Sequence, residues 1–322
     1  MSSPKSGNLL DWPAVTPRAG RPATSAEDHR RARLKRRIRE NLTAYALLCA
    51  ALVVFALFSW YPIVRGVLLS FQQVDFVNPP TWVGLDNFVR LFQDPLFGVA
   101  WRNTLLFTGF ALVFGFLVPF LAAVLLNELR HARAYFRLAV YLPVMLPPVV
   151  TALMWKWFYD PGPGLFNSAL TSVGLPGLQW LDSSTTAMLS LVFVSTWANM
   201  GSTTLIYLAA LQTIPGELYE AAELDGAGLW RRLRHVTFPQ TRFVLLVLLL
   251  LQIVATMQVF TEPYVMTGGG PDDSTVTVLL LLYRYAFVYN DFGSASAMSL
   301  LLFVALGVFS AMYVRLTRRA DD

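Results

Sequence analysis

Residues 214–239 read IPGELYEAAELDGAGLWRRLRHVTFP, a polar and charged stretch between two long apolar segments. Each flanking segment is long enough to cross a lipid bilayer, which takes about 20 mostly apolar residues. Connections between helices are short as a rule, so roughly 25 residues with an ordered pattern indicate a structured element. The stretch predicts two short helices that meet at Gly226 and offer a surface to another protein.

The composition of the whole chain is that of a membrane protein. Of its 322 residues, 55% are hydrophobic and 14% are charged, whereas about a quarter are charged in a soluble domain. Helices satisfy their own backbone hydrogen bonds in lipid, so the apolar segments predict an all-α membrane protein. We expect six transmembrane helices, at residues 43–69, 103–127, 135–157, 187–211, 242–265 and 294–316.

The basic residues predict the orientation of these helices. Most of the 25 Lys and Arg residues precede the first span, follow the second or fourth, or lie in the C-terminal tail. By the positive-inside rule these segments, including residues 214–239 and both termini, face the cytoplasm. The basic N-terminal run has no interleaved aromatic residues, and basic residues beside a span attract anionic membrane lipid. We therefore expect a lipid contact there and no nucleic-acid partner.

These observations predict three regions along the chain. Residues 1–41 form a cytoplasmic basic tail that is largely disordered, because its first part is rich in Ser, Pro and Gly. Residues 42–316 form the six-span domain, with a cytoplasmic loop at 213–240. Residues 317–322 form a second cytoplasmic tail.

The loop at 213–240 has the local signals of two helices. Pro215 suits the first turn of a helix, where no amide hydrogen is needed. Gly226 permits a turn that other residues resist. Glutamates that recur every third residue share one helix face, which predicts a basic residue on the partner surface: Glu217, Glu220 and Glu223.

Polar side chains inside the predicted spans are candidates for binding a solute. Such residues are expensive in lipid and face a cavity or another helix. The alternative is that they only join helices through hydrogen bonds. Glu262 is expected near the outer boundary, hydrated there. The candidate substrate-binding residues, from the fourth and fifth spans, are Asn199, Gln252, Thr256 and Gln258.

The string Glu220-Ala-Ala-x-x-x-Gly226, followed by Phe238-Pro239, resembles the EAA loop of permease subunits of binding-protein-dependent ABC importers. Asp225-Gly-Ala227 with Trp230 resembles the carbohydrate-uptake branch, the maltose and glycerol-phosphate type. Matching motifs elsewhere, such as Thr267-Gly-Gly-Gly-Pro271, extend the resemblance over about residues 43–316. The family often has a further proline after Phe-Pro, whereas this chain has Thr241-Arg-Phe243, which puts only the start of the fifth span in doubt.

The resemblance implies a permease subunit of an ATP-driven importer that moves a sugar or sugar-like solute across a bacterial cytoplasmic membrane. It implies three partners: a second homologous permease, a dimer of ATP-binding subunits, and an extracytoplasmic solute-binding protein. The loop would be the coupling helix that docks on the ATP-binding subunit. By this resemblance the coupling residues are Glu217, Glu220, Ala221, Ala222, Asp225, Gly226, Ala227 and Pro239.

The sequence offers no catalytic, metal or cofactor site. It lacks the Gly-x-x-x-x-Gly-Lys-Ser/Thr pattern of a nucleotide-binding loop, and its three histidines have no metal-ligand spacing. ATP hydrolysis is therefore expected on a separate chain. Two alternatives remain: import of a solute that is not a sugar, and an ion-driven transporter. An ion-driven transporter would usually carry charged relay residues mid-span, and these are nearly missing.

Overall fold

The computed structural model describes residues 26–75, 77–129 and 131–319. It divides into two compact units, residues 1–63 and 64–322, with the boundary inside the first predicted span. The first unit contains helix α1 (Ala26–Phe55) and the π-helical turn η1 (Ala56–Trp60). The tail predicted as largely disordered is thus helical from Ala26, in a segment rich in Arg, which favours helix. Residues 1–25 of that prediction lie outside the described residues.

The second unit is helical apart from one short hairpin. Helix α2 (Tyr61–Leu69) crosses the boundary between the units. The remaining elements are β1 (Gln72–Gln73), paired antiparallel with β2 (Thr81–Trp82), then α3 (Asp86–Gln93), α4 (Pro95–Glu128), α5 (Arg133–Tyr141), η2 (Leu142–Met145), α6 (Pro148–Phe158), α7 (Leu165–Ser172), α8 (Ala187–Leu211), α9 (Gly216–Leu224), α10 (Leu229–Arg232), η3 (Leu233–Thr237), α11 (Phe238–Thr256), η4 (Pro263–Thr267), α12 (Val278–Tyr283), η5 (Arg284–Val288) and α13 (Phe292–Arg319).

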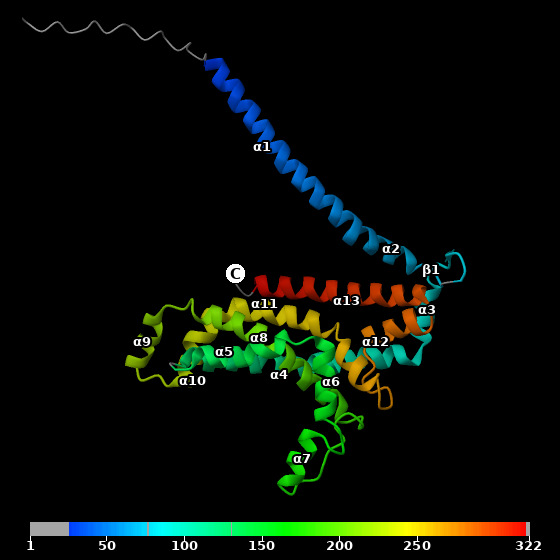
Figure 1. Ribbon diagram of the computed structural model, residues 1–322, viewed down its shortest axis with the longest axis vertical. Helices are drawn as coiled ribbons and strands as arrows, with labels where there is room; N and C mark the ends of the chain where they lie inside the picture. The colour runs from blue at the N-terminus through cyan, green and yellow to red at the C-terminus, as the bar shows by residue number, and fades with distance from the viewer. Residues whose placement is uncertain (1–25, 76, 130, 320–322) are drawn as a thin grey trace, which may run out of the picture. The chain divides into compact units, whose positions relative to one another are not determined.

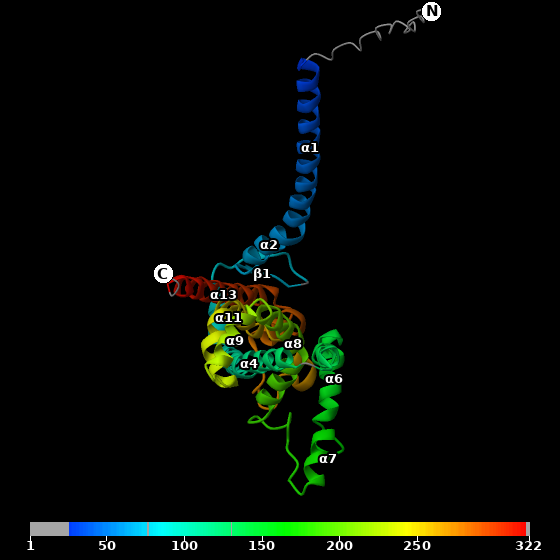
Figure 2. The same ribbon diagram turned by 90° about the vertical axis from the view of Figure 1, so that its left-hand side faces the viewer.

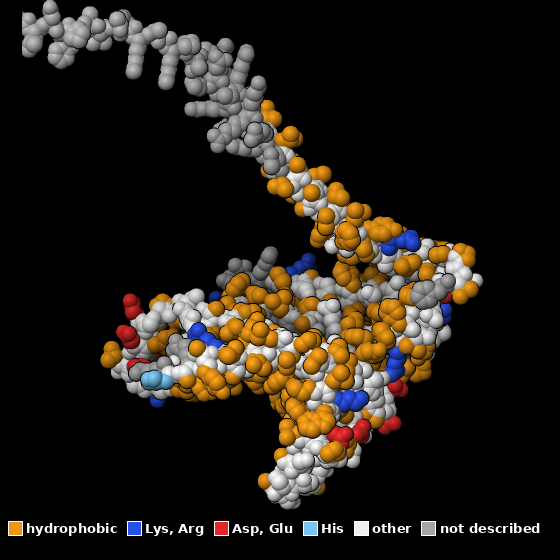
Figure 3. Space-filling model, in the orientation of Figure 1, with side chains coloured by type: hydrophobic (Ala, Val, Ile, Leu, Met, Phe, Trp, Pro, Cys, Tyr) orange, Lys and Arg blue, Asp and Glu red, His pale blue; other side chains and the backbone are white. Residues whose placement is uncertain are grey.

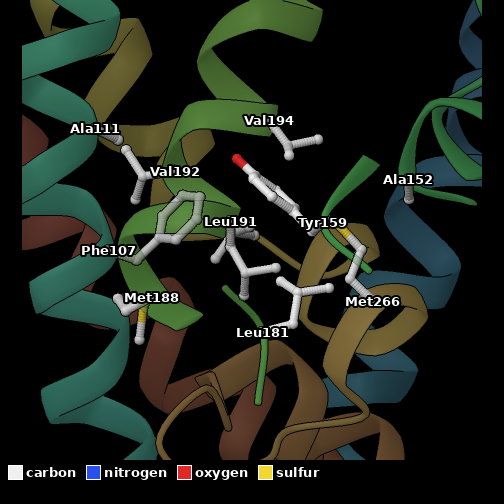
Figure 4. Close-up of a cluster of buried hydrophobic side chains, with 11 residues drawn as sticks. Phe107, Ala111, Ala152, Tyr159, Leu181, Met188, Leu191, Val192, Val194 and Met266 are labelled. Atoms are coloured by element: carbon white, nitrogen blue, oxygen red, sulfur yellow. The ribbon is translucent and has the colours of Figure 1, made fainter. Parts of the chain in front are cut away.

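Helices α4, α8 and α11 form the centre of this unit. Helix α8 packs along α4, and α11 lies against both (Figures 1 and 2). A cluster of buried side chains from α4, α8 and the segments near α6 and η4 fills the space between them, among them Phe107, Leu191 and Met266 (Figure 4). Helix α8 also approaches α5 closely at Gly201, where an added Cβ would lie 2.6 Å from the Val140 carbonyl oxygen.

The outer surface of the central helices is apolar. Figure 3 shows hydrophobic side chains covering their exposed sides, with charged side chains gathered toward the ends. Phe243 on α11 and Phe303 on α13 are both 67% exposed. Such large apolar side chains, continuous over a surface, suit contact with lipid or with another membrane helix.

The described part of the chain contains four helices that are long and apolar enough to cross a membrane: Ala44–Leu69, Pro95–Glu128, Leu229–Thr256 and Phe292–Thr317. They correspond to the first, second, fifth and sixth predicted spans. The third predicted span is a bent pair, with 101° between residues 134–145 and 148–158. Pro143, Pro147 and Pro148 lie at this bend. They account for it, because proline removes a helix hydrogen bond and clashes with the preceding turn.

The fourth predicted span is helix α8, which is long enough but less apolar than the four. Its 25 residues reach about 37 Å at 1.5 Å per residue. Polar side chains over its middle and second half lower its hydropathy, namely Ser195, Thr196, Asn199, Ser202, Thr203 and Thr204.

The helix that contains most of the fifth predicted span, residues 242–265, has other bounds than that segment. The apolar helix begins at Leu229 and ends at Thr256. Pro239 does not interrupt it, because the proline follows the π-helical turn η3, and such local adjustments accommodate the backbone groups that a proline frees. After Thr256 the chain turns at residues 257–260 before a short helical segment resumes.

Polar side chains from other helices satisfy the backbone where helices end. The Thr277 hydroxyl donates to the Val259 carbonyl at 3.0 Å, at the break that follows α11. The Asn103 side chain of α4 donates to the carbonyls of Asp273 and Val276 at 2.8 and 3.1 Å. The Thr104 hydroxyl beside it accepts from the Val278 amide at 2.9 Å. These contacts attach the segment before α12 to α4.

A second contact of this kind explains a glycine near the start of α13. The buried Asn87 side chain donates to the carbonyls of Ser70 and Gln72, both at 2.9 Å. Gly293 lies against the same contact, and a Cβ there would be 2.3 Å from the Gln72 carbonyl oxygen. Any larger residue at 293 would push the hairpin away from α3 and α13.

Replacing Asn103 by leucine should destabilise the protein. The partly buried Asp273 carbonyl and the buried Val276 carbonyl would lose their donor, and a buried group left unsatisfied costs about 1 to 3 kcal/mol. We expect Asn103→Leu to lower the free energy of unfolding by at least about 2 kcal/mol, measured as a lower melting temperature of the purified chain.

The matched control is Asn78→Leu, which replaces an exposed asparagine that bonds only to Asp75 nearby. Its effect should stay within about 0.5 kcal/mol, as for most surface substitutions. Equal melting temperatures for the two variants would contradict the assigned role of Asn103.

Candidate functional site

Residues 213–240 fold as a helix, a tight turn and a second helix. Helix α9 ends at Leu224, and Gly226 then adopts a left-handed conformation with φ of +71°. The Ala227 amide donates back to the Ala222 carbonyl at 2.8 Å, which closes the end of the helix. Pro215 directly precedes the first helical residue, one position before the first turn in which it was predicted. The predicted turn at Gly226 is therefore present, with a glycine where its conformation requires one.

Most of the surface of this helix–turn–helix is exposed. Helix α9 buries none of its residues, and Leu224 and Trp230 are 90% and 72% exposed. Large apolar side chains in this position favour contact with another surface. Of the predicted coupling residues, Ala222 and Ala227 are half-buried and the others are exposed, namely Glu217, Glu220, Ala221, Asp225, Gly226 and Pro239.

Glu223, one of the three glutamates of the predicted acidic face, also has a partner within the chain. Its carboxylate accepts from the guanidinium of Arg232, across the turn at Gly226. The hydroxyls of Tyr219 and Thr237 share a second hydrogen bond between the same two helical segments, at 3.1 Å. The pairing of Arg232 with Glu223 was not predicted from the sequence, although opposite charges on either side of the glycine are a signal for such a pair.

The second helix of this segment is continuous with α11. Helix α10, the π-helical turn η3 and α11 together form the apolar helix Leu229–Thr256. Its 28 residues span about 42 Å. One end carries the exposed Trp230, and the other carries Gln252 and Thr256.

Gln252 and Thr256 open onto a pocket between α4, α8 and α11, with a volume of about 500 Å³. All four predicted substrate-binding residues line this pocket: Asn199, Gln252, Thr256 and Gln258. The sequence predicted these residues on two different spans and could not show whether they lie close together. The packing of α8 and α11 against α4 brings them together.

The donor groups of these side chains are already used within the protein. Gln252 donates from Nε2 to the Ala111 carbonyl on α4 at 2.6 Å, which is the helix-joining role considered as the alternative. Asn199 donates to the Ser195 carbonyl at 2.8 Å, and Gln258 donates to the Val254 carbonyl at 2.9 Å. The amide oxygens of the three side chains meet no donor among the described residues, so they are free to accept from a solute.

Several lining residues were missed or judged otherwise from the sequence. Gly115 lets α4 approach the Gln252 side chain, since a Cβ there would lie 2.5 Å from its Nε2 atom. The Thr196 hydroxyl is buried without a hydrogen-bond partner among the described residues. Glu262 was expected at a hydrated boundary, yet it lines the same pocket. The sequence signal for Gly115 was a glycine within an apolar segment, and the signal for Glu262 was a carboxyl group close to the polar residues of the fifth span.

Aromatic rings continue from the pocket toward the loop segments. Phe260 lines the pocket and stacks on Tyr264, with ring centres 5.0 Å apart and planes at 13°. Tyr283 packs against both rings, at 5.3 and 4.9 Å. Stacked rings of this kind present flat apolar faces beside polar groups.

Metal chemistry finds no support in the part of the chain that the structure describes. It contains no group of three or more His, Cys, Asp or Glu side chains that could hold a metal ion. Cys49 is exposed on α1.

Comparisons with known proteins agree with this architecture. Residues 115–322 match the family described as binding-protein-dependent transport system inner membrane component. The probable ABC transporter permease protein YurN of Bacillus subtilis is 39% identical over 88% of this chain and 98% of its own. The trehalose/maltose transport system permease protein MalF of Thermococcus litoralis is 33% identical over 89% of this chain and 98% of its own.

A solved structure has the same fold. The chain superposes with a TM-score of 0.80 on a bacterial alginate ABC transporter in complex with an alginate pentasaccharide-bound periplasmic protein, at 26% identity. The match covers 89% of this chain and 98% of that one. The chain is thus a multi-pass membrane protein, a permease subunit and not an enzyme, and it belongs to the family of binding-protein-dependent transport system inner membrane components.

Proposed function

We propose that this chain is the permease subunit of an ATP-driven importer of a sugar or sugar-like solute, coupled to its ATPase through residues 213–240. The observation that carries this proposal is the continuous helix Leu229–Thr256. It joins the exposed helix–turn–helix at one end to the polar pocket at the other. A force applied at α10 would therefore be transmitted to the pocket lining along one helix.

We propose six membrane crossings with both termini in the cytoplasm of a bacterial cell. The four apolar helices supply four crossings, the bent pair supplies one, and α8 supplies the sixth. The polar side chains of α8 are tolerable in a membrane because they line the pocket and do not face lipid. The proposed regions are the basic tail 1–41, the permease domain 42–316 and the tail 317–322.

The partners follow from the two functional surfaces. The exposed α9–α10 segment, with Glu217 and Glu220 on its surface, suits docking into a groove of an ATP-binding subunit that carries a basic residue. A second homologous permease would close the open side of the pocket. An extracytoplasmic solute-binding protein would deliver the solute, as the complex of the related alginate transporter supports.

Sugar is the solute class that the pocket chemistry favours. Amide oxygens accept hydrogen bonds from hydroxyl groups, and the stacked rings of Phe260 and Tyr264 offer faces to the apolar side of a pyranose. The relative MalF is named as a trehalose/maltose transport system permease protein, which supports a sugar as the solute. Import of a different neutral solute is the second candidate, and an ion-driven mechanism is disfavoured because charged residues are nearly missing mid-span.

Replacing Gly226 by proline should uncouple the protein. Proline fixes φ near −65°, whereas Gly226 has φ of +71°, and proline would also lose the amide that donates to Glu223. We expect Gly226→Pro to abolish uptake and solute-stimulated ATP hydrolysis while membrane insertion remains normal. Both activities are measured on the assembled importer in proteoliposomes.

Gly228→Pro is the matched control, because Gly228 has φ of −69°, which proline adopts without strain. It should retain most of the activity. Normal transport by Gly226→Pro would count against the coupling role.

The ion pair between Glu223 and Arg232 should support coupling by holding the two helical segments together. Partly exposed pairs are worth up to about 1 kcal/mol, which corresponds to about fivefold in an equilibrium. Glu223→Arg and Arg232→Glu should each reduce solute-stimulated ATP hydrolysis by about that factor. The double variant restores the pair and should recover most of the rate. A double variant as slow as the single ones would show that the pair has no such role.

Asn199→Leu should weaken solute recognition, since the pocket loses an amide oxygen and gains an apolar side chain. A hydroxyl that loses its acceptor typically costs tenfold or more in discrimination. We expect the apparent KM for the transported sugar to rise about tenfold, with ATP hydrolysis in the absence of solute unchanged. The sugar is first identified by ligand screening of the cognate binding protein, and Asn78→Leu, outside the pocket, is the control. An unchanged KM would contradict the assignment of the pocket.

A further inference from the structure

The charge of the pocket carries information about the kind of sugar it accepts. Among the described residues that line it, the neutral polar side chains are amides and hydroxyls, and one residue is charged, Glu262. No Lys, Arg or His side chain lines it. A carboxylate in such a site therefore faces any bound solute without a compensating cation from this chain.

The position of Glu262 is fixed by its neighbours. Ser195 of α8 and Glu262 of the segment after α11 both line the pocket. Pro263 follows directly and is buried at the start of η4, which limits movement of the backbone there. Glu262 thus lies in the pocket lining directly before a buried proline, across from the lining residues of α8.

A neighbouring cavity of about 600 Å³ repeats the same charge bias. It is lined by one cation, Lys156, together with two acids, Asp160 and Asp182. It also includes Tyr264, which stacks on the pocket residue Phe260. A solute that reaches the pocket past this cavity meets more negative than positive charge.

From these observations we infer that Glu262 makes this permease selective for neutral saccharides over acidic ones. This inference rests on the proposed sugar-import function and adds the substrate class. A carboxylate accepts hydrogen bonds from sugar hydroxyls but repels the carboxylate of a uronate or the oxygens of a phosphate. The reported relatives include transporters of both kinds of cargo, trehalose or maltose in one and the acidic polysaccharide alginate in another. Glu262 places this chain with the first kind.

The inference can be tested without knowing the cargo, by measuring the electrostatic potential of the pocket. The native cysteine is removed by Cys49→Ser, and Ser202→Cys introduces one thiol into the pocket lining. In the complete importer at pH 8, this thiol is reacted with a cationic trimethylammonium and an anionic sulfonate methanethiosulfonate reagent. The ratio of the cationic to the anionic reaction rate is divided by the same ratio for free 2-mercaptoethanol, which corrects for the different intrinsic reactivities of the two reagents.

We expect the cationic reagent to be favoured about tenfold in this background, and E262Q to remove most of that preference. Gln258→Glu adds a carboxylate to the same lining and should increase the preference. Asp75→Asn removes a carboxylate outside the pocket and should leave the ratio unchanged. A ratio that does not respond to E262Q would overturn the inference.

A second measurement separates this inference from the proposed function. Neutral oligosaccharides and polyuronates of equal length are tested for their ability to slow labelling of the thiol. We expect protection by a neutral sugar, weak protection by the uronates, and a gain for the uronates of about tenfold in E262Q. Uronates that protect the unaltered pocket as well as neutral sugars overturn the charge selectivity alone. A charge ratio that responds to E262Q without protection by any saccharide overturns the assignment of sugar as the cargo.

Discussion

A backbone amide or carbonyl that leaves a helix inside a bilayer has to find a partner within the protein, because lipid offers none. This chain leaves helical geometry at several points, and polar side chains from other helices meet the exposed groups there. Asn103 serves the segment before α12, and Thr277 serves the break after α11. The polar residues of the apolar segments are thus needed for the fold before they are available for any solute. Gln252 combines both roles, since its amide nitrogen joins α11 to α4 and the residue also lines the pocket.

The same constraint explains how the proposed coupling surface at residues 213–240 can act on a distant pocket. A helix that satisfies its own backbone behaves as a rigid rod over its length. The helix Leu229–Thr256 begins beside the turn at Gly226 and ends at the polar pocket. The pair of Glu223 and Arg232 ties α9 to the start of this rod. Motion of a docked ATPase would therefore reach Gln252 and Thr256 as a tilt or shift of one body.

Much of this architecture is predictable from sequence patterns, and the failures have identifiable causes. Apolar segments revealed the helices, and the glycine at 226 revealed the turn, because few other residues adopt its conformation. The helix that contains most of the fifth predicted span starts about a dozen residues before that segment, because its first three turns carry arginines, which hydropathy assigns to a loop. The predicted segment extends past the end of this helix because the turn at residues 257–260 depends on a hydrogen bond from Thr277, a residue distant in sequence.

The candidate site was predictable as a set of residues but not as a geometry. The polar character of Asn199, Gln252, Thr256 and Gln258 identified them, whereas only the packing of α8 and α11 on α4 showed that they share one pocket. Gly115 was missed for the same reason, since a contact between helices leaves no local pattern, and Glu262 was noted as polar but not assigned to the pocket. Arg232 escaped because its carboxylate partner lies nine residues away, beyond the spacing of a single helix.

The most direct test of the account is a pair of distances measured by pulsed electron paramagnetic resonance on the complete importer. With Cys49 removed, one pair of spin labels replaces the exposed residues Trp230 and Leu251 on the proposed rod, and another pair joins Leu251 to Leu117 on α4. The account predicts that the first distance stays at about 32 Å with and without ATP, while the second changes. A first distance that changes by several ångströms on ATP binding, or a second that stays fixed, would contradict coupling through a rigid helix.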